Sequence, residues 1–306
     1  MSSNSINWNS CSLCPRRCFA DRSSPSSISK GFCRETKTLR LARAALHYWE
    51  EPCISGESGS GTVFFSGCTL RCVFCQNHQI ADGSVGKEVS IERFSQILLE
   101  LQEKGANNIN LVTPTHFVPQ IIDGIRLAQK CGLDLPIVYN TSGYETLETL
   151  QQLEGIVDIY LPDLKYKSSV LSQKYSFAGD YFSVASLALK EMYRQVGDPV
   201  FDQNGILQSG IIVRHLLLPG CKEDSKAVIQ YLYKTFGDHI YISIMNQYTP
   251  MPNIQSHYPE LNRKISDAEY DEVVDYAIDL GVENGFIQEG DTADESFIPS
   301  FDYEGI

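Results

Sequence analysis

Short apolar runs alternate with longer amphipathic stretches along most of this chain. Uninterrupted apolar runs predict buried strands, and apolar residues that recur every third or fourth position predict helices. The predicted strands cover residues 62–65, 108–112, 137–139, 156–161, 211–218, 240–245 and 285–288. The predicted helices cover residues 36–51, 91–104, 119–130, 145–153, 182–196, 225–236 and 266–280.

This strand–helix alternation is typical of an α/β fold in which helices cover a parallel sheet. The strands are nearly continuous apolar runs, as expected when both faces of a parallel sheet are buried. Six strand–helix units are too few to close an eight-stranded barrel. We predict a core domain at residues 53–288, a cysteine-rich N-terminal extension at residues 1–52, and an acidic C-terminal tail at residues 289–306.

Composition narrows the classes of partner and compartment. The formal net charge is −13, from 25 basic and 38 acidic residues, which disfavours nucleic acid because phosphate contacts need a basic surface. No apolar run is long enough for a transmembrane helix, and the first residues do not have the pattern of a signal peptide. We therefore expect a cytoplasmic protein that binds no membrane and whose cysteine spacings indicate metal binding or catalysis.

Three cysteines follow the first predicted strand. Its apolar run ends at Gly67, and Cys68, Cys72 and Cys75 come next in a C-x3-C-x2-C spacing, which predicts a buried strand leading into a short loop. Thiolates select zinc, copper(I) or iron–sulfur clusters. Structural zinc sites usually take four ligands, whereas three thiolates on a cubane cluster leave one iron open. A disulfide loop, a zinc knuckle and a chance spacing are the alternatives.

A second cysteine set lies near the N-terminus. Cys11, Cys14, Cys18 and Cys33 follow a C-x2-C-x3-C-x14-C spacing, which predicts a tetrahedral metal site. Zinc and an iron–sulfur cluster both suit four thiolates. The alternative is a set of free structural cysteines.

Polar residues gather where the predicted strands end, which is where parallel barrels carry their chemistry. Asp163 and Lys165 lie two residues apart, so in an extended chain they project to one side. That pair suits a zwitterionic ligand, and a surface ion pair is the alternative. Arg214 lies within an apolar strand and needs a partner, either a ligand carboxylate or a buried structural ion pair. His116 is a candidate ligand contact or a structural residue.

The cysteine loop resembles the signature of the radical S-adenosylmethionine (SAM) enzymes. Further motifs resemble the activating-enzyme branch of that superfamily, typified by the pyruvate formate-lyase activating enzyme, and its PflX-type iron–sulfur proteins. These motifs lie at residues 11–18, 50–56, 72–77, 112–117, 139–144 and 214–220, within a similarity that spans residues 11–280. The resemblance implies a partial (β/α)6 TIM-like barrel in place of a closed one.

The resemblance also implies a mechanism and a set of site residues. Cys68, Cys72 and Cys75 would ligate a 4Fe–4S cluster that cleaves SAM reductively to a 5′-deoxyadenosyl radical. The superfamily often has a Gly-Gly-Glu-type motif after the second strand; this chain departs from it, and Thr113 and Thr115 would supply acceptors instead. The residues expected around the cofactors are Phe74, Asn77, Thr113, Thr115, His116, Asn140, Thr141, Asp163, Lys165 and Arg214.

The substrate does not follow from these motifs. A protein, such as a glycyl-radical enzyme, and a small molecule both remain open, and the resemblance implies a flavodoxin- or ferredoxin-type electron donor. The alternative functions are a non-catalytic iron–sulfur electron-transfer protein and a zinc-stabilised binding module. SAM turnover distinguishes an enzyme from the first of these, and bound zinc without iron would indicate the second.

Overall fold

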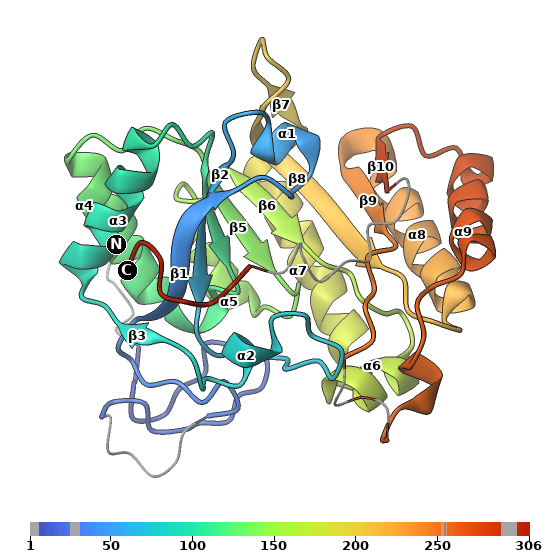
Figure 1. Ribbon diagram of the computed structural model, residues 1–306, viewed down its shortest axis with the longest axis horizontal. Coiled ribbons are helices and arrows are strands. Elements are labelled where there is room, and N and C mark those ends of the chain that lie inside the picture. Colours follow the sequence, from blue (N-terminus) through green and yellow to red (C-terminus); the bar gives the residue numbers. More distant parts are fainter. Residues whose placement is uncertain (1–5, 25–30, 252–253, 255, 289–298) are drawn as a thin grey trace.

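A sheet flanked by helices organises the computed structural model, which describes residues 6–24, 31–251, 254, 256–288 and 299–306 (Figure 1). Within these residues the strand order is β10-β9-β8-β6-β5-β4-β2-β1-β3, and β7 pairs with β8. The strands are β1 (Arg40–His47), β2 (Ser60–Phe65), β3 (Lys87–Glu88), β4 (Ile109–Val112), β5 (Ile137–Thr141), β6 (Ile159–Pro162), β7 (Val200–Phe201), β8 (Leu207–Leu216), β9 (Tyr241–Met245) and β10 (Gly285–Ile287).

The central strands confirm the predicted parallel pattern. β2, β4, β5, β6, β8, β9 and β10 pair side by side in parallel, and every residue of β2, β4, β5 and β6 is buried. The strands at the two ends of the order, β10 and β3, are not paired with each other in the described part of the chain. This is the predicted α/β fold, a partial TIM-like barrel that is open on one side.

Helices flank the sheet, with α3 and α4 on the left and α8 and α9 on the right in Figure 1. They are α1 (Pro52–Ser55), α2 (His78–Ala81), α3 (Ile91–Glu103), α4 (Val118–Lys130), α5 (Leu147–Gln151), α6 (Ser169–Ser176), α7 (Tyr181–Val196), α8 (Lys222–Phe236) and α9 (Asp267–Leu280). Several begin where a hydroxyl side chain caps the first turn, as Ser90 does for α3 and Thr146 for α5. Such a cap satisfies a backbone N–H that has no partner within the helix.

The predicted helix at residues 36–51 is wrong, because this segment contains strand β1, which pairs antiparallel with β2. The register shifts between Leu41 and Arg43, as it does at a β-bulge. Both faces of β1 are covered, so Leu41, Ala42, Ala44 and Ala45 are all buried. A bulge in a strand buried on both faces spaces apolar residues about as a helix does, which explains the error. β1 also joins the predicted N-terminal extension to the core sheet.

The predicted C-terminal tail includes a segment that packs against the sheet. Residues 289–298 lie outside the described residues, but residues 299–306 run along β1 (Figure 1). The backbone N–H of Ala44 donates to the carbonyl of Glu304 at 2.8 Å, and Arg43 pairs with Asp302 at 3.0 Å. The rings of Phe64 and Phe301 pack edge to face, with their centres 5.5 Å apart. These contacts make the segment part of the fold.

The N-terminal segment docks against the loops at the carboxyl ends of the strands. The carbonyl of Leu13 accepts hydrogen bonds from the hydroxyls of Thr146 and Thr149, at 3.2 and 2.6 Å. The side chain of Arg22 is fully buried and donates to the carbonyls of Glu35 and Thr36. None of the described helices is both long and apolar enough to cross a bilayer.

Candidate active site

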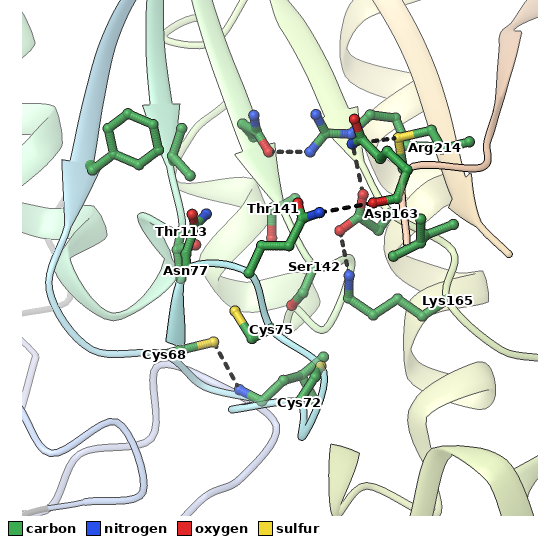
Figure 2. A pocket seen from close by; sticks show the side chains of 18 of the residues that line it. Cys68, Cys72, Cys75, Asn77, Thr113, Thr141, Ser142, Asp163, Lys165 and Arg214 are labelled. Carbon is green, nitrogen blue, oxygen red and sulfur yellow. Dashed lines mark hydrogen bonds and ion pairs between the residues drawn. The ribbon is translucent and has the colours of Figure 1, made fainter. Parts of the chain in front are cut away.

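A pocket of about 230 Å³ opens at the carboxyl ends of the parallel strands, and Figure 2 shows its lining. Its cysteines come from the loop after β2, and its charged groups come from the ends of β1, β6 and β8. The predicted site residues that line it are Cys68, Cys72, Phe74, Cys75, Asn77, Thr113, Asn140, Thr141, Asp163, Lys165 and Arg214. Residues more than one hundred positions apart in the sequence are therefore brought together in one pocket, and their roles in binding cofactors stay a prediction.

The three thiols lie on the same side of this pocket (Figure 2). The Cys68 sulfur accepts hydrogen bonds from the backbone N–H groups of Leu70 and Arg71, at 3.3 and 3.4 Å. Burial raises the pKa of the Cys72 and Cys75 thiols, while the nearby Lys165 ammonium lowers it. A metal that binds these sulfurs would displace their protons. Three soft donors with N–H groups aimed at sulfur fit an iron–sulfur cluster.

Asp163 and Lys165 form the predicted pair. The Lys165 ammonium lies 2.5 Å from a carboxylate oxygen of Asp163. Burial alone would raise the pKa of Asp163, but Lys165 and Arg214 outweigh it and hold this pKa below its usual value. Both side chains line the pocket, so a charged pair remains within reach of a bound molecule.

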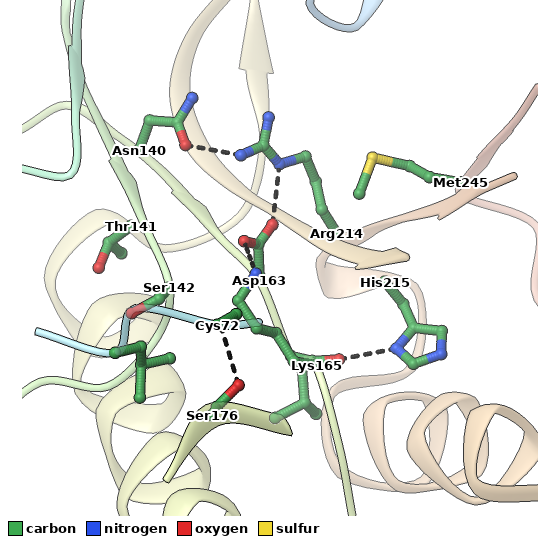
Figure 3. Close-up of polar contacts among 12 residues, drawn as sticks. Cys72, Asn140, Thr141, Ser142, Asp163, Lys165, Ser176, Arg214, His215 and Met245 are labelled. Carbon is green, nitrogen blue, oxygen red and sulfur yellow. Dashed lines mark hydrogen bonds and ion pairs between the residues drawn. The ribbon is translucent and has the colours of Figure 1, made fainter. Parts of the chain in front are cut away.

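Arg214 adopts the structural alternative to ligand binding. Its three nitrogens contact Asp163 at 3.2 Å, Glu50 at 3.0 Å and the amide oxygen of Asn140 at 2.6 Å, and Figure 3 shows two of these contacts. These contacts use three of the five N–H groups of the guanidinium. The structure thus shows the buried ion pair, in which Arg214 organises the pocket wall, and binding of a carboxylate of SAM or substrate by Arg214 stays a prediction.

Thr113 is the first residue after β4 and has a φ of +59°, which is rare for a β-branched residue. Its N–H donates to the carbonyl of Asn140 at 2.9 Å, which holds this conformation. Strained backbone of this kind tends to occur at functional sites. Phe74 packs edge to face against Tyr166 and Tyr248, at 6.4 and 6.3 Å, so its ring has a fixed place in the pocket.

Thr115 and His116 do not line the pocket, contrary to expectation. Both are buried in the short 3-10 turn Thr115–Phe117. The Nε2 atom of His116 contacts the carbonyl of Ser66 at 2.7 Å, beneath the cysteine loop. Burial lowers the pKa of His116 to about 3, so it is neutral near pH 7. The structure therefore gives both residues a supporting role.

The hydroxyl of Thr115 instead donates to the buried carboxyl group of Glu145, at 2.6 Å. Thr141 donates to the same oxygen. Burial raises the pKa of Glu145 to about 7. Because Thr141 also lines the pocket, this carboxyl group supports one wall of the site from behind.

Sequence reasoning missed the contribution of β1 and the segment after it. His47, Trp49 and Glu50 line the pocket, and Glu50 also accepts a hydrogen bond from Asn110 at 2.9 Å. Burial lowers the pKa of His47 to about 4. The motif at residues 50–56 carried the signal for Glu50, but only a correct strand at β1 would have placed that motif in the pocket.

The N-terminal cysteines share one small region. A Cβ atom added to Gly31 would lie 2.8 Å from the Cys18 sulfur and 3.9 Å from the Cys33 sulfur. Arg22 donates to the Cys11 sulfur at 3.5 Å. Within the described residues, however, no group of three or more His, Cys, Asp or Glu side chains, Cys68, Cys72 and Cys75 included, is arranged so that it could hold a single metal ion. The predicted N-terminal metal site is therefore not preformed and stays a prediction.

Comparisons with known proteins find a family model that matches part of the chain that lines the pocket. Residues 62–166, which include the cysteine loop, Asp163 and Lys165, match the model of the radical SAM superfamily. An uncharacterised protein of Methanocaldococcus jannaschii is 26% identical over 283 residues, which cover 88% of this chain and 75% of that protein.

Three solved structures are similar to parts of this chain at low sequence identity. A domain of pyruvate-formate lyase-activating enzyme from Bacteroides vulgatus has a TM-score of 0.40 and 15% identity, covering 56% of this chain and 91% of that one. Methylornithine synthase has a TM-score of 0.48 and 12% sequence identity, and the match covers 72% of this chain and 68% of that one. SuiB of Streptococcus suis bound to S-adenosylmethionine has a TM-score of 0.47 and 15% sequence identity, and the match covers 73% of this chain and 48% of that one.

Proposed function

We propose that this chain is a radical SAM enzyme in which Cys68, Cys72 and Cys75 hold a 4Fe–4S cluster, since residues 62–166 match the model of that superfamily. The observation that carries this proposal is that the three thiols line one pocket together with the Asp163–Lys165 pair. When bound, such a cluster supplies the electron that cleaves SAM to a 5′-deoxyadenosyl radical, which removes a hydrogen atom from the substrate.

The side chains around the thiols have roles that follow from their charge and position. The Lys165 ammonium offsets the negative charge of the thiolates, and the N–H groups that reach the Cys68 sulfur do the same locally. The Asp163 carboxylate and Lys165 ammonium offer opposite charges to the amino and carboxylate groups of SAM. Phe74 supplies an apolar ring for the adenine, and Asn77, Thr113, Asn140 and Thr141 offer polar contacts.

The proposed substrate is a protein, such as a glycyl-radical enzyme, or a small molecule, and the proposed electron donor is a flavodoxin- or ferredoxin-type protein. The motif similarity to the activating-enzyme branch supports both. We also propose that Cys11, Cys14, Cys18 and Cys33 gather around zinc or a second iron–sulfur cluster when metal is supplied. The proximity of Cys18 and Cys33 across Gly31 supports this second site.

The direct test is formation of 5′-deoxyadenosine. The protein is reconstituted with iron and sulfide under anaerobic conditions, supplied with SAM and dithionite, and compared with Cys72→Ala. Cys131→Ala is the matched control, because Cys131 is exposed and lies outside the pocket. We expect product from the wild type and from Cys131→Ala but not from Cys72→Ala. Bound iron without product in all three proteins would refute SAM cleavage and favour an electron carrier.

A further inference from the structure

The carboxyl end of α6 contacts the cysteine loop at its middle thiol. The Ser176 hydroxyl donates to the Cys72 sulfur at 2.9 Å (Figure 3). The neighbouring residues are also joined, because the N–H of Val73, next to Cys72, donates to the carbonyl of Tyr175, next to Ser176, at 2.9 Å. Ser176 is fully buried, so water does not compete for its hydroxyl. The cysteine loop and the end of α6 therefore hold one another in register.

A second hydroxyl orients the proton of Ser176. The hydroxyl oxygens of Tyr166 and Ser176 are 2.8 Å apart, and Tyr166 is also buried. A metal-bound thiolate has no proton and can only accept. The chain of donors then runs from Tyr166 to Ser176 to the Cys72 sulfur, and each hydrogen bond in such a chain strengthens the next.

Arg16 links the backbone at Ser176 to the backbone of the cysteine loop. Its guanidinium donates to the carbonyl of Ser176 and to that of Thr69 in the loop, both at 2.8 Å. It also lies over the ring of Phe32, at 4.0 Å from the ring centre. An arginine at the end of a helix offsets the partial negative charge of the last carbonyls. The N-terminal segment thus helps to aim the Ser176 hydroxyl.

We propose that Ser176 sets the reduction potential of the cluster through its hydrogen bond to the Cys72 sulfur, with Tyr166 and Arg16 as positioning residues. The inference rests on the proposed binding of a cluster by Cys72. A donor at a ligand sulfur draws electron density away from the metal and stabilises the reduced, more negative cluster. Removal of the hydroxyl should therefore make the cluster harder to reduce.

The test compares Ser176→Ala with Ser172→Ala in anaerobically reconstituted protein. Ser172 is a matched control, because it is buried on the same helix and its hydroxyl donates to the carbonyl of Ser169. The measurements are iron content and the midpoint potential from a redox titration followed by electron paramagnetic resonance. We expect full iron in both variants, a more negative potential for Ser176→Ala, and an unchanged potential for Ser172→Ala.

Equal potentials in Ser176→Ala and wild type, at full iron content, would overturn the proposal and leave cluster binding by Cys72 intact. If wild-type protein holds no cluster, the proposed function and this inference both fail. If Ser176→Ala loses iron, Tyr166→Phe becomes the deciding variant, since it keeps Ser176 and removes only the group that aligns it. A potential shifted to more negative values in Tyr166→Phe supports the proposal, and an unchanged one overturns it.

Discussion

Glu145 shows how one buried group ties the stability of the fold to the pocket wall. Its carboxyl group is enclosed, and the hydroxyls of Thr115 and Thr141 donate to one of its oxygens. Burial raises its pKa from 4.5 to about 7. The folded protein therefore holds a proton that the unfolded chain releases between these two values. Stability from this group is present below pH 4.5 and is lost as the pH rises toward 7.

We predict that Glu145→Gln, which cannot ionise, becomes more stable relative to wild type as the pH rises. From pH 5 to pH 8 the difference in free energy of unfolding should shift in favour of the variant by about 2.5 kcal/mol, which is most of what the full pKa shift corresponds to. Urea unfolding at both pH values measures it. A difference that stays constant with pH would mean that Glu145 ionises in the folded state as readily as in the unfolded chain.

At the scale of elements, β1 and residues 299–306 form one wall of the pocket together. β1 leads directly to Glu50, and Pro299 lines the pocket where the C-terminal segment reaches it. Phe301 anchors that segment on Phe64 of β2. The wall therefore depends on contacts between segments that are far apart in the sequence.

We predict that Phe301→Ala loosens this wall. Because Phe301 is only partly buried, the loss of stability should be about 1–2 kcal/mol, less than for a fully buried ring. SAM binding, measured by calorimetry on the reconstituted protein, should weaken as well. Tyr303→Ala is the matched control, since Tyr303 lies in the same segment and is exposed. Equal affinity for SAM in both variants would contradict a role for the segment in the pocket.

At the scale of the whole molecule, the N-terminal segment that carries Cys33 contacts the loop that carries Cys68, Cys72 and Cys75. Gly67 has a φ of +82°, and an added Cβ atom would lie 2.5 Å from the carbonyl oxygen of Cys33. The N-terminal segment therefore packs directly behind the cysteine loop. This close approach requires glycine.

We predict that the two sets bind metal independently. A variant with Cys68, Cys72 and Cys75 all replaced by alanine should lose the iron of the cluster and keep the metal bound at Cys11, Cys14, Cys18 and Cys33, as measured by elemental analysis. Adding Cys14→Ala and Cys18→Ala to that variant should remove the remaining metal. A triple variant with neither zinc nor iron would refute a metal site in the N-terminal segment.

The sequence by itself determined the parallel core and the main chemistry of the pocket. Apolar runs predict buried strands wherever both faces are covered, and the C-x3-C-x2-C spacing brings three thiols into one loop. The two-residue spacing of Asp163 and Lys165 likewise fixes their common side. These features are local, so the chain carries them without reference to distant residues.

Only the tertiary structure decided which distant groups meet. Arg214 is satisfied by Glu50, 164 residues earlier, and no local pattern predicts that pairing. β1 has an apolar spacing similar to that of a helix, and only its pairing with β2 makes it a strand. His116 lies beneath the loop and Ser176 contacts Cys72 because of how the elements pack. Burial, charge pairing and hydrogen bonding across the fold therefore determined these roles.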